Sequence, residues 1–109
     1  MRFLMYGTGD VQGAPPSQEL MTEVARFTEE TRRAGILLAT GGLGQGITRV
    51  RSSSGKLSVT DGPFTETKEL TGGFALVEVK SREEAIEWAK RFRKIVGDGD
   101  SMIQEVFGG

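Results

Sequence analysis

The fold of this chain is decided by the stretch Thr60-Asp61-Gly62-Pro63-Phe64-Thr65-Glu66-Thr67-Lys68-Glu69, hereafter the charged segment. It begins as a rigid turn, because Pro63 fixes its own φ and keeps Gly62 out of the α region. Asp61 is suited to cap backbone N–H groups of that turn with its side chain. A turn requires none of the three charges that follow, at Glu66, Lys68 and Glu69. The segment is therefore both a structural joint and a candidate site.

The first half of the chain predicts a strand, a helix and a second strand. An apolar run over 3–6 indicates a buried strand, and the Gly- and Pro-rich residues 9–16 indicate a loop. Ser17 is a suitable N-cap for the helix that follows, and Gly35 is a suitable residue to end it. The apolar residues at helical spacing are Leu20, Met21, Val24, Phe27 and Ala34. The second strand is expected over 36–40.

Glycines at 41, 42, 44 and 46 predict a loop after that strand. Residues 49–52 and 57–60 flank Ser53-Ser54-Gly55-Lys56, which is typical of a β-hairpin. Past the charged segment, residues 73–79 are rich in β-forming side chains and predict a strand.

The last part of the chain predicts a helix and a strand. Ser81 followed by Glu84 fits a capping box, and the helix that it opens carries Ala85, Ala89, Phe92 and Val96 on one stripe with Trp88 beside them. Gly97-Asp98-Gly99-Asp100 ends this helix, and 102–107 is the last strand.

The order of elements predicts an α+β fold, a ferredoxin-like split βαβ with an inserted hairpin, in one domain over 1–109. Both helices should cover one face of the sheet. The strands are nevertheless apolar on both faces, as Phe3 and Met5 against Leu4 and Tyr6 illustrate. Monomers rarely expose so large an apolar patch, so we expect a homodimer that packs sheet to sheet. Polar residues within these strands, Arg2, Glu78, Gln104 and Glu105, would in part line a pocket between the sheets.

The amino-acid composition excludes several kinds of catalytic and metal-binding site. The 109 residues include no Cys and no His, so cysteine nucleophiles, disulfides and a Ser-His-Asp triad are excluded, and we expect no transition metal and no cofactor. The net charge of −1 argues against direct binding to nucleic acid. No apolar run approaches the length of a membrane span, and we expect a cytoplasmic protein that does not bind membranes.

Neither glycine-rich loop fits a nucleotide site. Gly41 and Gly46 have the spacing of a Walker A loop, but Ile47-Thr48 stand where Lys-Ser/Thr is required. The Gly7-Thr8-Gly9 turn lacks the third glycine of a dinucleotide fingerprint.

The candidate catalytic residues are Asp61, Glu66 and Lys68. In an extended segment Glu66 and Lys68 point to one side, where Lys68 could bind an anionic group while a carboxylate moves a proton. The alternative is a solvated ion pair of little energetic weight. Further candidates for ligand binding are Tyr6, Arg49, Gly62, Pro63, Phe64 and Glu69. Tyr6 offers a hydroxyl and Arg49 can hold a carboxylate or phosphate, whereas Phe64 is either core or pocket wall.

The chain resembles the YCII-related (DGPF) family. The resemblance rests on 1–6, 27–36, the charged segment from Val59 onward, Gly72-Gly73-Phe74 and 84–89. It implies a ferredoxin-like subunit that forms a dimeric α/β barrel, with a cleft lined by the charged segment. Some members of the family are linked to sigma factors, and the activity of the family is largely undefined. Another branch is thought to use a His-Asp pair, which a chain without His cannot form.

Two functions follow as expectations. The first is a small-molecule site at the dimer cleft, with an acid–base enzyme as its catalytic form. The second is a regulatory or interaction module without turnover, linked to transcription through a sigma factor. Convergent, partly buried carboxylates beside Lys68 would favour chemistry, and an outward-facing segment without a cavity would favour docking.

Overall fold

The computed structural model describes residues 1–8, 17–44, 46–62 and 73–108. Within these residues the elements are β1 (Arg2–Thr8), α1 (Gln18–Arg33), β2 (Leu37–Gly42), β3 (Thr48–Ser53), β4 (Lys56–Asp61), β5 (Gly73–Glu78), α2 (Arg82–Val96) and β6 (Asp100–Val106). This is the order that the sequence predicts, and the mixed α+β class is confirmed.

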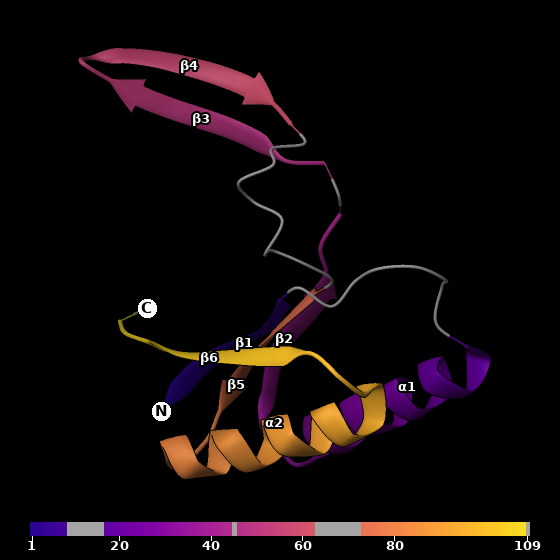
Figure 1. The fold of residues 1–109 in the computed structure, drawn as a ribbon. Helices are drawn as coiled ribbons and strands as arrows, with labels where there is room; N and C mark the ends of the chain where they lie inside the picture. The colour runs from indigo at the N-terminus through magenta and orange to yellow at the C-terminus, as the bar shows by residue number, and fades with distance from the viewer. Residues whose placement is uncertain (9–16, 45, 63–72, 109) are drawn as a thin grey trace.

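One antiparallel sheet has the strand order β2-β5-β1-β6, and β3 pairs separately with β4. Both helices lie on the same face of the four-stranded sheet, and the β3–β4 hairpin stands off on the opposite side (Figure 1). The arrangement is the ferredoxin-like plan with a hairpin inserted between its second and third strands.

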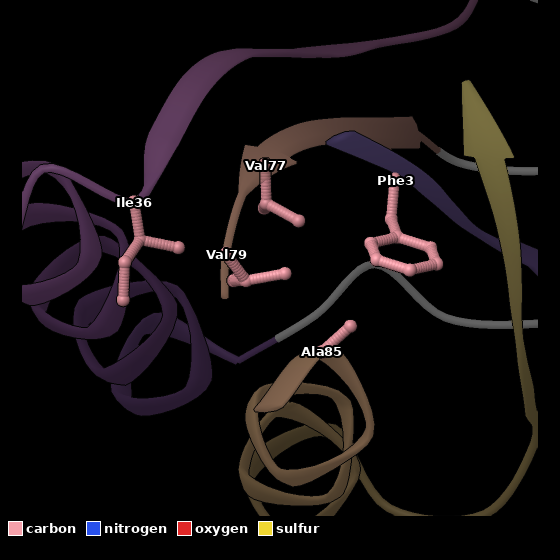
Figure 2. Close-up of a cluster of buried hydrophobic side chains, with 5 residues drawn as sticks. All are labelled: Phe3, Ile36, Val77, Val79 and Ala85. Carbon is pink, nitrogen blue, oxygen red and sulfur yellow. The ribbon is translucent and has the colours of Figure 1, made fainter. Parts of the chain in front are cut away.

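The core lies between the sheet and the helices. Phe3 and Val77 project from adjacent registered strands, and with Ile36, Val79 and Ala85 they form the buried cluster (Figure 2). Ala85 is fully buried. Its small side chain lets the backbone of α2 approach the sheet closely.

Local signals set the bounds of α1. The Ser17 hydroxyl accepts from the Leu20 N–H at 3.1 Å, and Gly35 follows the helix with a φ of 75° that favours glycine. Met21 is 59% exposed, so its predicted place on the apolar stripe of α1 is wrong. Thr31 is buried on this helix instead. The Thr31 hydroxyl is accommodated because it donates to the Thr28 carbonyl at 2.8 Å.

The capping box of α2 is present in a shifted form. The Ser81 hydroxyl accepts from the Glu84 N–H at 3.1 Å, as predicted. The Glu84 carboxylate accepts from the Lys80 N–H at 2.9 Å, one residue before the cap. Gly97, with a φ of 93°, ends the helix.

Some predicted strand ends are wrong. β1 continues past Tyr6 through Gly7 and Thr8, which pair with Ser101 and Asp100 of β6. Gly41 and Gly42 continue β2 instead of starting a loop, because they pair with Phe74 and Gly73 of β5. A Cβ on Gly73 would lie 2.8 Å from the Gly41 carbonyl oxygen, so the two strands approach closely where glycines meet. At the other end of the chain, β6 stops at Val106 and Phe107 is 81% exposed.

The hairpin turn follows from its sequence. Ser54 and Gly55 have φ values of 51° and 78°, as a two-residue type I′ turn requires. The register runs from Ser53 opposite Lys56 at the tip to Thr48 opposite Asp61 at the base.

Candidate functional site

The helix-free face of the sheet, hereafter the open face, is largely apolar. Side chains alternate along a strand, and Phe3 and Val77 point to the helices, so their neighbours Leu4 and Leu76 point to the open face. The register places further side chains beside them. The apolar residues of the open face are Leu4, Tyr6, Phe74, Leu76, Met102 and Val106. All are partly or fully exposed in the protomer, so the expected second apolar face is present.

A polar pair lies within this apolar surface. The Tyr6 hydroxyl donates to the Gln104 Oε1 at 2.6 Å, between the adjacent strands β1 and β6. The register places Phe74 and Met102 opposite Tyr6 on either side. The Tyr6 hydroxyl is thus oriented by a neighbour on the open face, and its contact with a ligand stays a prediction.

A charged cluster lies at the far end of the same strands. The Glu78 carboxylate accepts from the Met1 amino group at 2.8 Å and from the Arg2 Nε at 3.1 Å. Both hydrogen bonds hold the pKa of Glu78 below its ordinary value, and the bond from the amino group has a larger effect than the bond from the guanidinium. The predicted polar residues Arg2, Glu78 and Gln104 therefore share the open face, whereas Glu105 pairs with Phe3 on the helix side.

Asp61 lies at the base of the hairpin. Its Oδ1 accepts from the Thr48 hydroxyl at 2.8 Å, and the next residue, Gly62, donates its N–H to the Ile47 carbonyl at 2.7 Å. Asp61 is therefore the last residue of β4, so the strand pairing extends further than the turn chemistry of Asp-Gly-Pro suggests. The predicted turn continues into Pro63, which lies outside the described residues. Arg49 pairs with Thr60, which places it on the other face of the hairpin from Asp61.

The remaining candidates, Pro63, Phe64, Glu66, Lys68 and Glu69, lie outside the described residues. The meeting of Lys68 with the carboxylates therefore stays a prediction. Tyr6 hydrogen-bonds to Gln104 and Asp61 hydrogen-bonds to Thr48, so these two candidates have different partners.

Gln104 is one of the polar strand residues that the sequence suggests for the lining of a pocket, but it is not among the predicted site residues. The pattern marks it as a polar residue in an apolar strand, which is a signal that it does more than pack. Its partner Tyr6 is 98 positions away, so only the pairing of β1 with β6 reveals the contact.

A shallow hollow of about 500 Å³ lies elsewhere, between α2 and β6. Lys90, Arg93, Lys94 and Asp100 line it, with apolar side chains between them. None of the predicted site residues that the structure describes borders this hollow.

Neither a metal-ligand cluster nor a membrane-spanning helix is present in the described part of the chain. No three potential metal ligands cluster there. No helix in that part has the length and apolar character needed to cross a membrane.

The fold defines the class of this protein as ferredoxin-like α+β with an inserted hairpin. Comparison with known proteins identifies its family. The sequence profile of the YCII-related domain matches residues 1–99. The chain belongs to the YCII-related family, as its resemblance to the DGPF pattern predicts.

One solved structure is similar to this chain over nearly the whole length of both. It is the 5-chloro-2-hydroxyhydroquinone dehydrochlorinase from Burkholderia phenoliruptrix AC1100 in complex with 2,5-dihydroxybenzoquinone. The match covers 100% of this chain and 96% of that one, with a TM-score of 0.52 and 16% sequence identity. At this identity the likeness shows a shared fold.

A relative found by sequence matches a smaller part of this chain than the dehydrochlorinase does. An uncharacterised protein of Rhizobium meliloti (strain 1021) is 46% identical over 41 residues, which are 38% of this chain and 33% of the relative. The match thus spans about a third of that relative's length.

Proposed function

We propose that the open face binds a small, planar organic molecule with carbonyl or hydroxyl groups, and that a second copy of the chain closes the site. The observation that carries this proposal is the Tyr6–Gln104 pair, held at 2.6 Å within an apolar surface. Ligand sites are typically apolar with a few placed polar groups that fix orientation.

The pair offers complementary hydrogen-bonding groups. Tyr6 uses its O–H on Gln104, so its phenolic oxygen remains an acceptor, and the Gln104 amide retains two N–H donors. Phe74 and Met102, on either side of Tyr6, supply an apolar wall for an aromatic or quinonoid ring. The fold of the dehydrochlorinase, whose structure holds 2,5-dihydroxybenzoquinone, supports a ligand of this class.

The catalytic form of the proposal assigns proton transfer to the charged segment. Asp61 or Glu66 removes a proton from a ligand hydroxyl, and Lys68 stabilises the oxyanion that remains. Glu69 holds a polar group of the ligand, and the backbone from Gly62 to Phe64 shapes the rim of the site, whereas Arg49 faces away from Asp61 on the hairpin and takes no part in this step. The electron pair stays on the ligand oxygen, so the step needs no cofactor.

Calorimetric titration with 2,5-dihydroxybenzoquinone tests the binding site. We expect Tyr6→Phe to weaken binding about tenfold, the value of one hydrogen bond of ~1 kcal/mol or slightly more. Thr22→Val, a hydroxyl deletion on the helix side, should leave the affinity unchanged. Failure of the unmodified protein to bind the probe at millimolar concentration, or equal affinity in Tyr6→Phe, would refute the proposal. Lys68→Met tests the catalytic form, and it should reduce affinity for the anionic probe while changing stability by at most about 1 kcal/mol.

The second candidate function is a regulatory module without turnover, coupled to a sigma factor as the family resemblance implies. The exposed apolar side chains of the β3–β4 hairpin favour it, since an uncovered apolar surface marks an interaction site. It becomes the preferred function if the probe does not bind and a second copy leaves the hairpin uncovered.

A further inference from the structure

The β3–β4 hairpin is amphipathic. Val50 pairs with Val59, and Leu57 pairs with Ser52 two positions along, so the three apolar side chains lie on one face. The other face carries Arg49, Arg51 and Lys56. In the protomer Val50, Leu57 and Val59 are 67%, 76% and 69% exposed.

Among the described elements, β3 and β4 make extensive contacts only with each other. In that part of the chain they also pair as strands only with each other. Figure 1 shows the hairpin projecting away from the sheet and both helices. A two-stranded hairpin alone is marginally stable in water, so its apolar face requires a cover.

The surroundings favour a second copy as that cover. The hairpin projects on the open-face side of the sheet, so a molecule that covers the open face lies beside the hairpin (Figure 1). Residues 48–61 hold three basic and one acidic side chain. The basic side chains lie on the face opposite Val50, Leu57 and Val59, so they stay outside the apolar contact. Three basic residues are fewer than the clusters of four to eight that bind anionic lipids.

We propose that the hairpin is an arm that packs Val50, Leu57 and Val59 onto a second copy of the chain. Twofold symmetry makes the contact reciprocal, so each copy receives the arm of the other. Asp61 and Thr48 lie on the same face of the hairpin, at its base. The arm therefore carries Asp61 to the boundary between the two subunits. The proposal requires no ligand and stands independently of the binding site.

Sedimentation equilibrium tests the arm. The triple variant Val50→Thr, Leu57→Thr and Val59→Thr keeps β-branched residues in the strands but removes the apolar surface. We expect its dimer dissociation constant to rise at least about 100-fold. The matched control, Arg51→Thr with Lys56→Thr, changes the opposite face of the same hairpin and should shift the constant less than about threefold.

A second measurement needs no variant. In a mixture of ¹³C-labelled and unlabelled protein, isotope-filtered NOEs should connect the methyl groups of Val50, Leu57 and Val59 to the other copy. Their observation supports the arm even where the triple variant fails to fold. Any of three results overturns the proposal: a monomer at about 100 μM, a dimer without these NOEs, or equal dissociation constants for the triple variant and the control. Binding of the monomer to anionic vesicles would assign the arm to a membrane instead.

Discussion

At the scale of single residues, Arg91 joins the two helices. Its guanidinium donates to Glu30 at 2.7 Å and lies 5.1 Å and 4.8 Å from the ring centroids of Phe27 and Trp88. These rings also contact each other, with centroids 5.9 Å apart. The Arg91 side chain therefore combines an ion pair with two cation–π contacts. Because this side chain and Glu30 lie at the surface, each contact contributes little to the free energy of unfolding.

Replacement of Arg91 by Met should raise the pKa of Glu30 to its ordinary value. The hydrogen bond from Arg91 is the main cause of the depressed pKa of Glu30 in the folded protein. A depressed folded pKa stabilises the protein above the pKa of the unfolded chain, and this stabilisation is lost as pH falls through the folded value. Carboxyl ¹³C shifts followed through an acid titration measure the change. Arg82→Met, which removes only a contact to Glu83 at 3.8 Å, is the control and should leave Glu30 unaffected.

Ala85 tests how tightly the core is packed. It is fully buried beneath Phe3, Val77 and Val79. Ala85→Leu adds a branched side chain where no space is available, and we expect a loss of about 1–3 kcal/mol in the free energy of unfolding. Ala25→Leu places the same change on an exposed position of α1 and should be nearly neutral. Equal midpoints of urea unfolding for the two variants would show that α2 moves away from the sheet at little cost.

At the scale of elements, the contact between β2 and β5 depends on glycine. Gly73→Ala would bring a Cβ to 2.8 Å from the Gly41 carbonyl oxygen, a backbone atom that can move only with its strand. We expect a loss of about 1–3 kcal/mol and a lower Tm. The control is Gly44→Ala, because a Cβ there meets no atom within 4 Å. A Tm for Gly73→Ala that matches the control would mean that the sheet edge adjusts freely.

Local chemistry explains which elements the sequence could predict. The caps at Ser17 and Ser81 and the turn at Ser54-Gly55 depend on neighbours within four residues, and all three are confirmed. Strand ends depend on a distant partner. Gly41 and Gly42 read as a loop because glycine is a poor β-former, and only pairing with β5 places them in a strand.

The candidate site shows the same limit. The position of Tyr6 on a two-sided apolar strand was predictable from alternation, but its partner Gln104 was not, because the contact joins the first and last strands. Asp61 reads as a turn residue from Asp-Gly-Pro alone. Its pairing with Thr48 depends on the register of the whole hairpin, which the turn at the far end determines.

At the scale of the whole molecule, the protomer is extended. Its radius of gyration is 16.0 Å, whereas a compact chain of this length has about 13 Å. The projecting hairpin accounts for the shape (Figure 1). Two apolar surfaces, the open face and the apolar side of the hairpin, remain exposed together. Full burial of a Val or Leu side chain contributes about 1.5–3 kcal/mol, so association that covers both surfaces has a strong driving force.

Hydrogen exchange at two protein concentrations should separate the arm from the sheet. In a monomer, β3 and β4 form an isolated pair, so their amides should exchange through local opening, while β1 remains protected between β5 and β6. In a dimer the arm is covered. We therefore expect the amides of Arg51 and Ser58, which form a hydrogen-bonded pair across the hairpin, to exchange at least about tenfold faster in dilute solution, with β1 amides changing much less. Where the dimer persists on dilution, the triple variant of Val50, Leu57 and Val59 supplies the monomer. Hairpin amides as slow in the monomer as in the dimer would mean that the arm is stable alone, and its apolar face would then need no second copy to hold it.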